Sequence, residues 1–298
     1  MKYTGLFALG CGLLTATAGI AGTTASDSKQ TITTPEQPPL TEIISIDSSY
    51  DFSSRINQRN VRRVDTLYNS IELGHRIQVN GPWYFRVGAA YERYDLGSKD
   101  LGPLPNTMQS AAGVFALEYR YQDYTAWQFE IRPGVYFEHE VTFGAFDIPF
   151  NFGGVIPIVD KKFMAVVGVG GALLWKYPVF PAVGFLWIPR DNLQVRAYLP
   201  EPQIRYSVND HLDVWFGGQF TEAAYKTGFN SDSDTSRGVI DYQDYRVGIG
   251  GNYSPRRGFN IALNAGYSIR QEFDFYRAEK RFISDPTPYV RLQASVEW

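Results

Sequence analysis

Apolar and polar residues alternate with a period of two through most of the chain after residue 41. The pattern is clearest in residues 289–298, where Val290, Leu292, Ala294, Val296 and Trp298 are separated by single polar residues. A period of two predicts a strand with one apolar and one polar face. Similar patterns occur in residues 67–79, 83–92, 115–132, 212–220, 245–253 and 259–270. The chain is therefore predicted to be all-β.

The connections between these stretches alternate between short and long. The short ones are 80–82, 122–125, 159–162, 189–192, 208–210 and 254–258, and the long polar ones are 54–65, 96–109, 226–238 and 275–285. Short turns at one end and long loops at the other are typical of transmembrane antiparallel β-barrels of the Gram-negative outer membrane. Counting back from Trp298 predicts about fourteen strands, with both termini in the periplasm.

The region 141–202 is the weakest part of this prediction. Residues 163–175 and 179–188 are nearly all apolar and do not alternate. A helical hairpin is the rival interpretation, but the glycines at 168, 170 and 171 favour strands. Lys176, Pro178 and Pro181 also interrupt any span of about 20 apolar residues. Short strands here would give twelve strands as the alternative count.

Composition agrees with a membrane barrel. Aromatic residues make up 15% of the chain and mean hydropathy is −0.25, too low for a bundle of apolar helices. Aromatic residues near the short turns are predicted to form a membrane-interface girdle and to support assembly. They are Trp83, Tyr121, Trp127, Trp187, Tyr253, Phe259 and Trp298. A soluble, lipid-binding periplasmic barrel is the alternative, and the girdle and the terminal Trp298 count against it.

The N-terminus has the features of a secretory signal peptide over residues 1–25. Lys2 precedes an apolar stretch, 5–14, and cleavage is expected after Ala21 or Ala25. Residues 26–40 are predicted to be a disordered periplasmic leader and residues 41–298 the barrel. The single cysteine, Cys11, lies within the signal. A lipoprotein site there is disfavoured, because Leu9 stands where a small residue is expected.

One region resembles a known family. The segments Pro181-Ala-Val-Gly-Phe-Leu-Trp-Ile-Pro189, Leu199-Pro-Glu-Pro202, Ile204-Arg-Tyr206 and Asp210-His-Leu-Asp-Val-Trp-Phe-Gly-Gly218 are similar to a bacterial family of unknown function grouped with outer-membrane β-barrels. Ala265-Gly-Tyr-Ser-Ile-Arg270 fits the same family. The resemblance covers about the C-terminal half. It implies the barrel fold and no catalytic residues.

The polar faces of the strands are predicted to line the lumen, with acids and bases mixed, often two residues apart. The lumen candidates are Glu72, Arg76, Arg86, Glu92, Glu118, Arg120, Glu130, Arg132, Arg196, Asp213, Arg246, Arg270, Arg291 and Glu297. The first interpretation is a ladder of ion pairs that makes the interior rigid. The alternative is an arginine-rich constriction that selects anionic or polar solutes.

No catalytic, metal or cofactor site emerges from the sequence. His75, His139 and His211 have no serine two residues away, which counts against a lipid-deacylating barrel. Asp210 and His211 are adjacent and so point to opposite faces, and His139 with Glu140 gives too few metal ligands. The net charge of −3 argues against nucleic acid as a partner.

The expected partners are therefore outer-membrane lipid and the barrel-assembly machinery, which recognises the last strand of such proteins. Lipopolysaccharide is a further candidate. Arg59, Arg62 and Arg63 fall in the first long loop, and residues 275–285 carry three more basic residues. The leading functional hypothesis is a passive, porin-like channel or uptake barrel for small solutes. A closed structural or surface-interaction barrel with an ion-paired interior is the alternative, and a lipid-modifying enzyme is third.

Overall fold

The computed structural model describes residues 40–56, 63–97, 104–121, 124–159, 162–228, 235–256 and 258–298. The expected signal and leader lie outside them, except that Leu40 already opens the first strand. The strands are β1 (Leu40–Ser54), β2 (Val64–Asn80), β3 (Trp83–Gly97), β4 (Thr107–Tyr121), β5 (Tyr124–Ile131), β6 (Gly134–Phe137), β7 (Phe146–Asp147), β8 (Phe150–Val159), β9 (Phe163–Gly171), β10 (Val179–Arg190), β11 (Leu193–Ala197), β12 (Gln203–Ser207), β13 (Leu212–Lys226), β14 (Val239–Arg256), β15 (Phe259–Phe275), β16 (Lys280–Ile283) and β17 (Thr287–Glu297). A 3-10 helix, η1, covers Phe143–Ala145.

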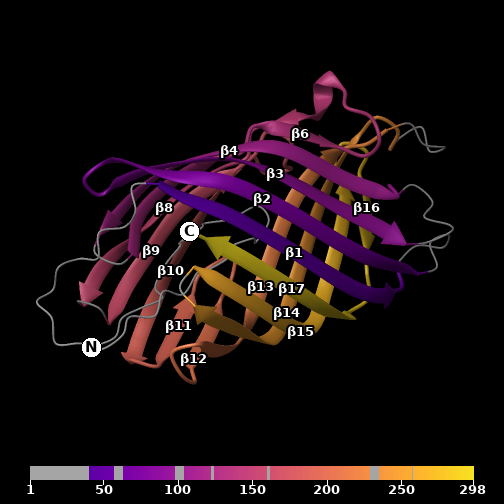
Figure 1. Cartoon of the computed structure of the whole chain (residues 1–298). Helices are drawn as coiled ribbons and strands as arrows, with labels where there is room; N and C mark the ends of the chain where they lie inside the picture. Colours follow the sequence, from indigo (N-terminus) through magenta and orange to yellow (C-terminus); the bar gives the residue numbers. More distant parts are fainter. Residues whose placement is uncertain are drawn as a thin grey trace, which may run out of the picture.

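Fourteen of these strands close an antiparallel ring within the described chain (Figure 1). The ring runs from β1 to β5, continues from β8 to β15, and returns through β17 to β1. It closes where Asp47 on β1 lies opposite Gln293 on β17. The expected fold and count of fourteen are confirmed. Residues 141–202 form strands and not a helical hairpin, because glycines on β8 and β9 allow close backbone pairing.

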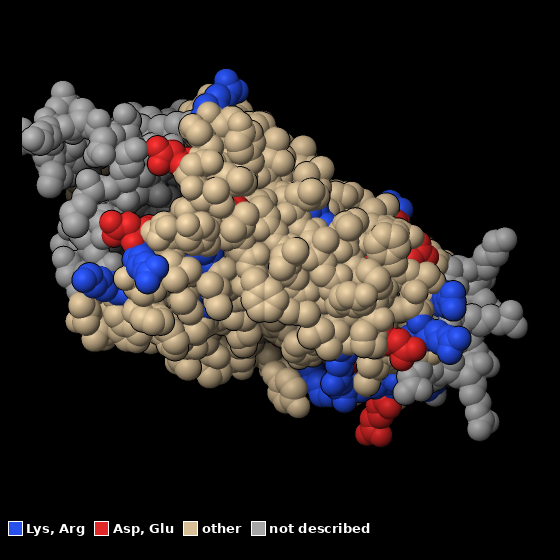
Figure 2. All heavy atoms as spheres, turned by 90° about the horizontal axis from the view of Figure 1, so that it is seen from below, with Lys and Arg blue, Asp and Glu red and all other residues tan. Residues whose placement is uncertain are grey.

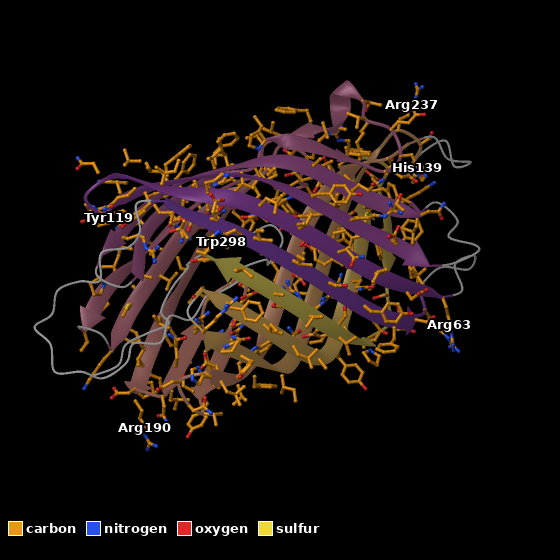
Figure 3. The ribbon with its side chains drawn as sticks, viewed as in Figure 1. Arg63, Tyr119, His139, Arg190, Arg237 and Trp298 are labelled. Atoms are coloured by element: carbon orange, nitrogen blue, oxygen red, sulfur yellow. The ribbon has the colours of Figure 1, made fainter. Side chains whose placement is uncertain are left out.

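The described chain begins and ends at the same end of the barrel. The backbone N–H of Glu42 donates to the carbonyl of Trp298 at 2.8 Å. The turns of two to four residues after β2, β10 and β12 lie at this end, which we call the short-turn end, and the longest connections, after β1, β3 and β13, join strands at the opposite, long-loop end. Figure 3 shows Tyr119, Arg190 and Trp298 towards the first end and Arg63, His139 and Arg237 at the second.

The barrel is apolar outside and polar inside, the reverse of a soluble protein. Leu73, Val183 and Leu263 are 48–75% exposed, whereas charged residues such as Asp47, Glu130 and Asp244 are 1–2% exposed. Figure 2 shows a wide surface with few charged residues, flanked by charged residues at both ends. Only a lipid surround makes such an exterior favourable, so this is the fold of a transmembrane barrel. None of the described residues forms a helix long and apolar enough to cross a membrane.

The barrel wall is made of shorter strands on the side of β8–β12, and we call this side the low wall. Strands β11 and β12 have only 5 residues each, whereas β13 has 15. Strand β6 continues the line of β5 beyond Pro133, pairs with the long-loop half of β4, and contacts β13 at Lys226. The upper wall on this side is therefore completed by β6, β7 and the connection between β9 and β10.

That connection, residues 172–178, joins the two sides of the low wall. The carboxylate of Asp147 on β7 accepts the N–H groups of Leu173 and Leu174 at 2.7 and 3.4 Å, and Asp241 on β14 accepts the N–H of Lys176 at 3.3 Å. Trp175, at 2% exposure, packs into the apolar interior.

An apolar cluster fills the long-loop end of the lumen. Tyr68, Tyr94, Tyr242 and Phe273 form a chain of rings with centroids 4.6, 5.1 and 5.1 Å apart. We call the following set the aromatic cluster: Tyr68, Tyr94, Tyr136, Tyr225, Tyr242, Phe273, Phe275 and Phe282. All of these side chains are at most 7% exposed. The lumen is thus closed by packed rings at one end, and the polar groups gather below them.

Candidate functional site

The charged residues of β2–β5 form one connected network inside the barrel. The Arg86 guanidinium contacts Glu72 at 2.9 Å and Glu118 at 3.5 Å, and it also bonds Glu130. Arg132 contacts Glu72 at 2.9 Å and Glu130 at 2.7 Å. Every one of these side chains is at least about six-sevenths buried, so each charge depends on its partners. We call these five residues the ion-pair network.

The ion-pair network continues towards the short-turn end and reaches across β1 to β17, where the barrel closes. Arg76 donates to Glu118 at 3.1 Å and to Glu297 of β17 at 3.4 Å. Arg120 lies over the ring of Tyr84 at 5.7 Å near the short-turn end. Glu92 extends the network in the other direction, towards the long-loop end, where it contacts Arg132 at 3.8 Å. The strict alternation of β2 to β5 places these residues on the inner face.

A second set of ion pairs joins β14 and β17 to β1. Arg246 contacts Asp51 and Asp244, each at 2.7 Å, and Arg291 donates to Asp47 at 2.9 and 3.0 Å. Asp47 and Asp51 were not among the sequence candidates. Their signal was the polar series Ser45, Asp47, Ser49 and Asp51 at every second position, which Ser48 and Tyr50 obscure on the other face.

The other lumen candidates are placed less uniformly. Arg196 is buried and bonds Gln194 at 2.9 Å, whereas Asp213 is partly exposed and lies 3.9 Å from Arg205. Arg270 differs from the expectation. A β-bulge shifts the register between Tyr245 and Arg246, so that Arg270 pairs opposite the exposed Tyr245 and faces outward. It bonds Glu272 there at 2.6 Å.

A polar cavity lies on the opposite side of the lumen from the ion-pair network. It contains about 620 Å³ of space, counted with the solvent that it opens onto, and lies between β12–β15, β17 and β1. Eight of its seventeen lining residues have side chains that both donate and accept hydrogen bonds. The amides are Gln203, Gln219, Asn252, Asn260, Asn264 and Gln293, and the hydroxyls are Ser45 and Ser295.

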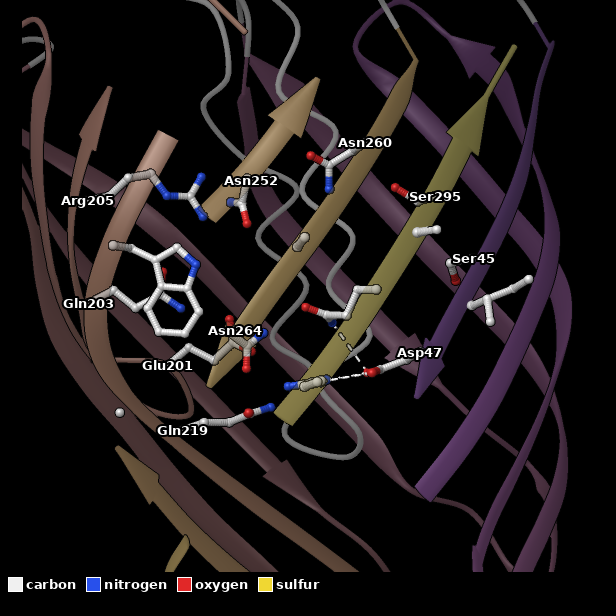
Figure 4. A pocket seen from close by; sticks show the side chains of 17 residues that line it. Ser45, Asp47, Glu201, Gln203, Arg205, Gln219, Asn252, Asn260, Asn264 and Ser295 are labelled. Carbon is white, nitrogen blue, oxygen red and sulfur yellow. Dashed lines mark hydrogen bonds and ion pairs between the residues drawn. The ribbon is translucent and has the colours of Figure 1, made fainter. Parts of the chain in front are cut away.

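The lining also contains four charged residues, two acidic and two basic, and five others, Ile46, Trp215, Gly218, Ala262 and Ala294. Arg291 and Gln293 both donate to Asp47, as the dashed lines in Figure 4 show. In the same view Glu201, Gln203 and Arg205 face Asp47 and Ser45 across the cavity, with Asn252, Asn260 and Asn264 between them. Most of these residues have no distinct signal in the sequence, because amides carry no charge and β12 is too short to show a period.

The aromatic girdle candidates lie towards the short-turn end. Trp83, Trp187, Tyr253 and Trp298 are 42–60% exposed. Trp127 stacks on Phe152 with centroids 5.6 Å apart, and Tyr121 and Phe259 are the terminal residues of β4 and β15. These positions suit an indole or phenol at a membrane–water boundary.

The three histidines do not come together with catalytic partners. His75 lies 2.6 Å from Glu42, His139 lies 3.5 Å from Glu138, and His211 contacts the carbonyl of Ser254 at 3.0 Å. No group of three or more metal-ligating side chains occurs in the part of the chain that the structure describes. What the interior offers is fixed charge, amides and a cavity, which can bind or pass a solute.

Comparisons with known proteins returned structural likenesses only. No protein-family model matches the chain, so its resemblance to a family of unknown function stays a prediction. A search of the curated proteins also found no match.

Several solved outer-membrane proteins are similar. The match to the Pseudomonas putida toluene transporter TodX covers 87% of this chain and 88% of the TodX chain, with 11% identity and a TM-score of 0.43. An outer-membrane channel from Pseudomonas putida F1 covers 87% and 95%, with 10% identity and a TM-score of 0.45. The translocator domain of autotransporter NalP from Neisseria meningitidis covers 87% and 88%, with 9% identity and a TM-score of 0.40. At these values the fold assignment rests on the strand pairing of the chain itself.

Proposed function

We propose that this chain is an outer-membrane β-barrel that admits small solutes by passive diffusion. The observation that carries the proposal is the polar cavity inside a closed ring whose exterior is apolar. A polar lumen gives a hydrophilic solute a route past the hydrocarbon core, and the cavity opens onto that lumen.

The aromatic cluster is the gate in this account. Tyr94, Tyr225 and Tyr242 lie between the cavity and the long-loop end, and Tyr225 and Tyr242 are fully buried. A solute can pass only when these rings move apart. Packed rings of this kind change rotamer without unfolding the strands that carry them, so the gate can open within an intact barrel.

A closed structural barrel is the second candidate, and the ion-pair network favours it. Arg86 and Arg132 tie β2, β3 and β5 together through shared glutamates. Such a network stiffens the wall on that side and occupies the lumen beside it.

The two candidates differ in solute flux. We expect liposomes containing the purified protein to swell in glycerol faster than protein-free liposomes, and Tyr225→Ala to increase the rate several-fold by opening the gate. The matched control is Tyr206→Ala, because Tyr206 is 46% exposed on the outer wall. If only liposomes with Tyr225→Ala swell, the result would support the closed barrel. If liposomes with neither the unaltered chain nor Tyr225→Ala swell, the result would contradict both the channel and the gate.

We further propose that the termini are periplasmic, that the chain has no catalytic activity, and that its partners are membrane lipid, lipopolysaccharide and the assembly machinery. Arg63 is exposed at the long-loop end, while Arg59 and Arg62 lie outside the described residues. In the second basic loop, residues 275–285, part of the positive charge is paired within the protein, because Arg281 bonds Glu272.

The role of the last strand in assembly is tested with Trp298→Asp. We expect less folded barrel in the outer membrane, because the exposed indole suits the interface and a carboxylate does not. Trp187→Asp, at the same end of the barrel, separates a general girdle effect from one specific to the last strand. Equal membrane levels of Trp298→Asp and the unaltered chain would refute the proposed role.

A further inference from the structure

Four buried polar atoms that line the polar cavity have no hydrogen-bond partner: Gln203 Oε1, Arg205 Nε, Asn264 Oδ1 and Ser295 Oγ, on residues that are 4–8% exposed. Other atoms of this kind are spread through the described part of the barrel. A buried polar atom without a partner costs about 1–3 kcal/mol, and such atoms are rare in native proteins. Four of them around one cavity indicate a site made to hydrogen-bond a guest. Water could satisfy them too, so the kind of guest depends on two further features.

The first feature is an aromatic side chain among these polar groups. Trp215 lines the cavity and lies directly opposite Gly250 on the neighbouring strand. A Cβ at position 250 would lie 2.6 Å from Cε2 and Cζ2 of the indole, so glycine is what lets the ring lie against the backbone of β14. The cavity thus combines an indole with amides and hydroxyls. Molecules that carry both C–H faces and many hydroxyl groups match this combination.

The second feature is the balance of charge. Asp47 and Glu201 contribute two negative charges, and Arg205 and Arg291 contribute two positive ones. Arg291 is already committed to Asp47. An anion would meet Asp47 and Glu201, and a cation would meet Arg205 and Arg291, each within a partly desolvated site. A neutral solute avoids both penalties.

We propose that this cavity binds a neutral polyhydroxylated solute of the sugar or cyclitol class. The inference rests on the proposed uptake function and names its solute class. Twelve of the seventeen residues that line the cavity are polar or charged, and Trp215 supplies an apolar face beside them.

The test is direct binding to the purified full barrel in an amine-oxide detergent, since glucoside and maltoside detergents carry the chemistry being probed. Titration calorimetry would compare glucose and myo-inositol with gluconate, glucosamine and toluene. We expect saturable binding of at least one of the two neutral polyols, and binding at least tenfold weaker for the anion, the cation and the hydrocarbon. Tighter binding of a charged analogue or of toluene would overturn the proposal, as would no binding by either polyol.

Two variants assign the binding to this cavity. Trp215→Leu and Asn264→Leu are each expected to weaken polyol binding at least tenfold. Trp187→Leu is the matched control, because Trp187 is 46% exposed on the outer wall, and it should bind like the unaltered chain. Heat-modifiable mobility on electrophoresis checks that each variant is folded. Unchanged affinity in both folded cavity variants would refute the site.

Liposome swelling separates this inference from the proposed function. Swelling with equal rates in neutral and charged solutes of one size, together with no calorimetric binding, would leave the channel standing and remove the sugar site. Polyol binding without swelling in any solute would keep the site and remove the channel.

Discussion

On β2–β5 the lumen is lined by arginines and glutamates that bond one another, whereas on β12–β15 and β17 it is lined by amides and hydroxyls around a cavity. Glu72, Glu130, Arg86 and Arg132 pair with one another across three strands. Two guanidinium nitrogens there make no hydrogen bond, Arg86 Nε and Arg132 Nη1, but they lie 3.5 and 3.8 Å from the carboxylates of Glu118 and Glu92. Gln203, Asn264 and Ser295 keep buried atoms that bond nothing in the chain. The polar groups on β2–β5 therefore stabilise the barrel wall, whereas those around the cavity keep hydrogen-bonding capacity for a guest.

The largest effect is expected where the ion-pair network is broken. Glu130→Ala leaves Arg86 and Arg132 short of a partner, and removing one member of a buried pair costs about 3–5 kcal/mol. The unfolding free energy from urea titration of the barrel in lipid vesicles measures it. Glu42→Ala is the control, because Glu42 pairs with the half-exposed His75 on the outer face. A loss no larger than that of Glu42→Ala would end the distinction between the two sides.

An intermediate effect is expected for the ion pair at the border of the two regions. Asp47→Asn removes the charge that Arg291 contacts, and hydrogen bonds to charged groups contribute about 1.5–3 kcal/mol. The double variant Asp47→Asn with Arg291→Gln should lose less than the sum of the two single losses, because neither charge is then left alone. The same urea titration gives all three values, and strict additivity would mean that the pair is not coupled.

The smallest effect on stability is expected in the cavity. Asn264→Leu removes an amide oxygen that has no partner, so the unfolding free energy should change by less than about 1 kcal/mol. Solute binding should nevertheless fall. A stability loss close to that of Glu130→Ala would show that the amides, like the ion pairs, serve to hold the wall together.

The two sides of the lumen also differ in how much of each could be predicted from the sequence. Period-two alternation in β2–β5, β13–β15 and β17 predicts the barrel and most of the network, because long regular strands fix which face each residue occupies. The strand number was left at fourteen or twelve, because residues 141–202 do not alternate. Arg270 was placed wrongly, since a bulge changes the face and leaves no mark in a period count. The short strands β11 and β12 carry too few residues to show a period, so Gln203 and Arg205 were not singled out.

We propose that solutes pass through the lumen beside the polar cavity. A blocking experiment at Gln219 tests this passage most directly. Gln219 lines this cavity and a smaller one that Tyr94 and Tyr68 also line. In a Cys11→Ser background, labelling Gln219→Cys with a bulky thiol reagent should reduce glucose-driven swelling of proteoliposomes by at least half. Labelling Asn69→Cys on the outer wall should leave it unchanged. Equal flux before and after labelling Gln219→Cys would contradict passage through this lumen.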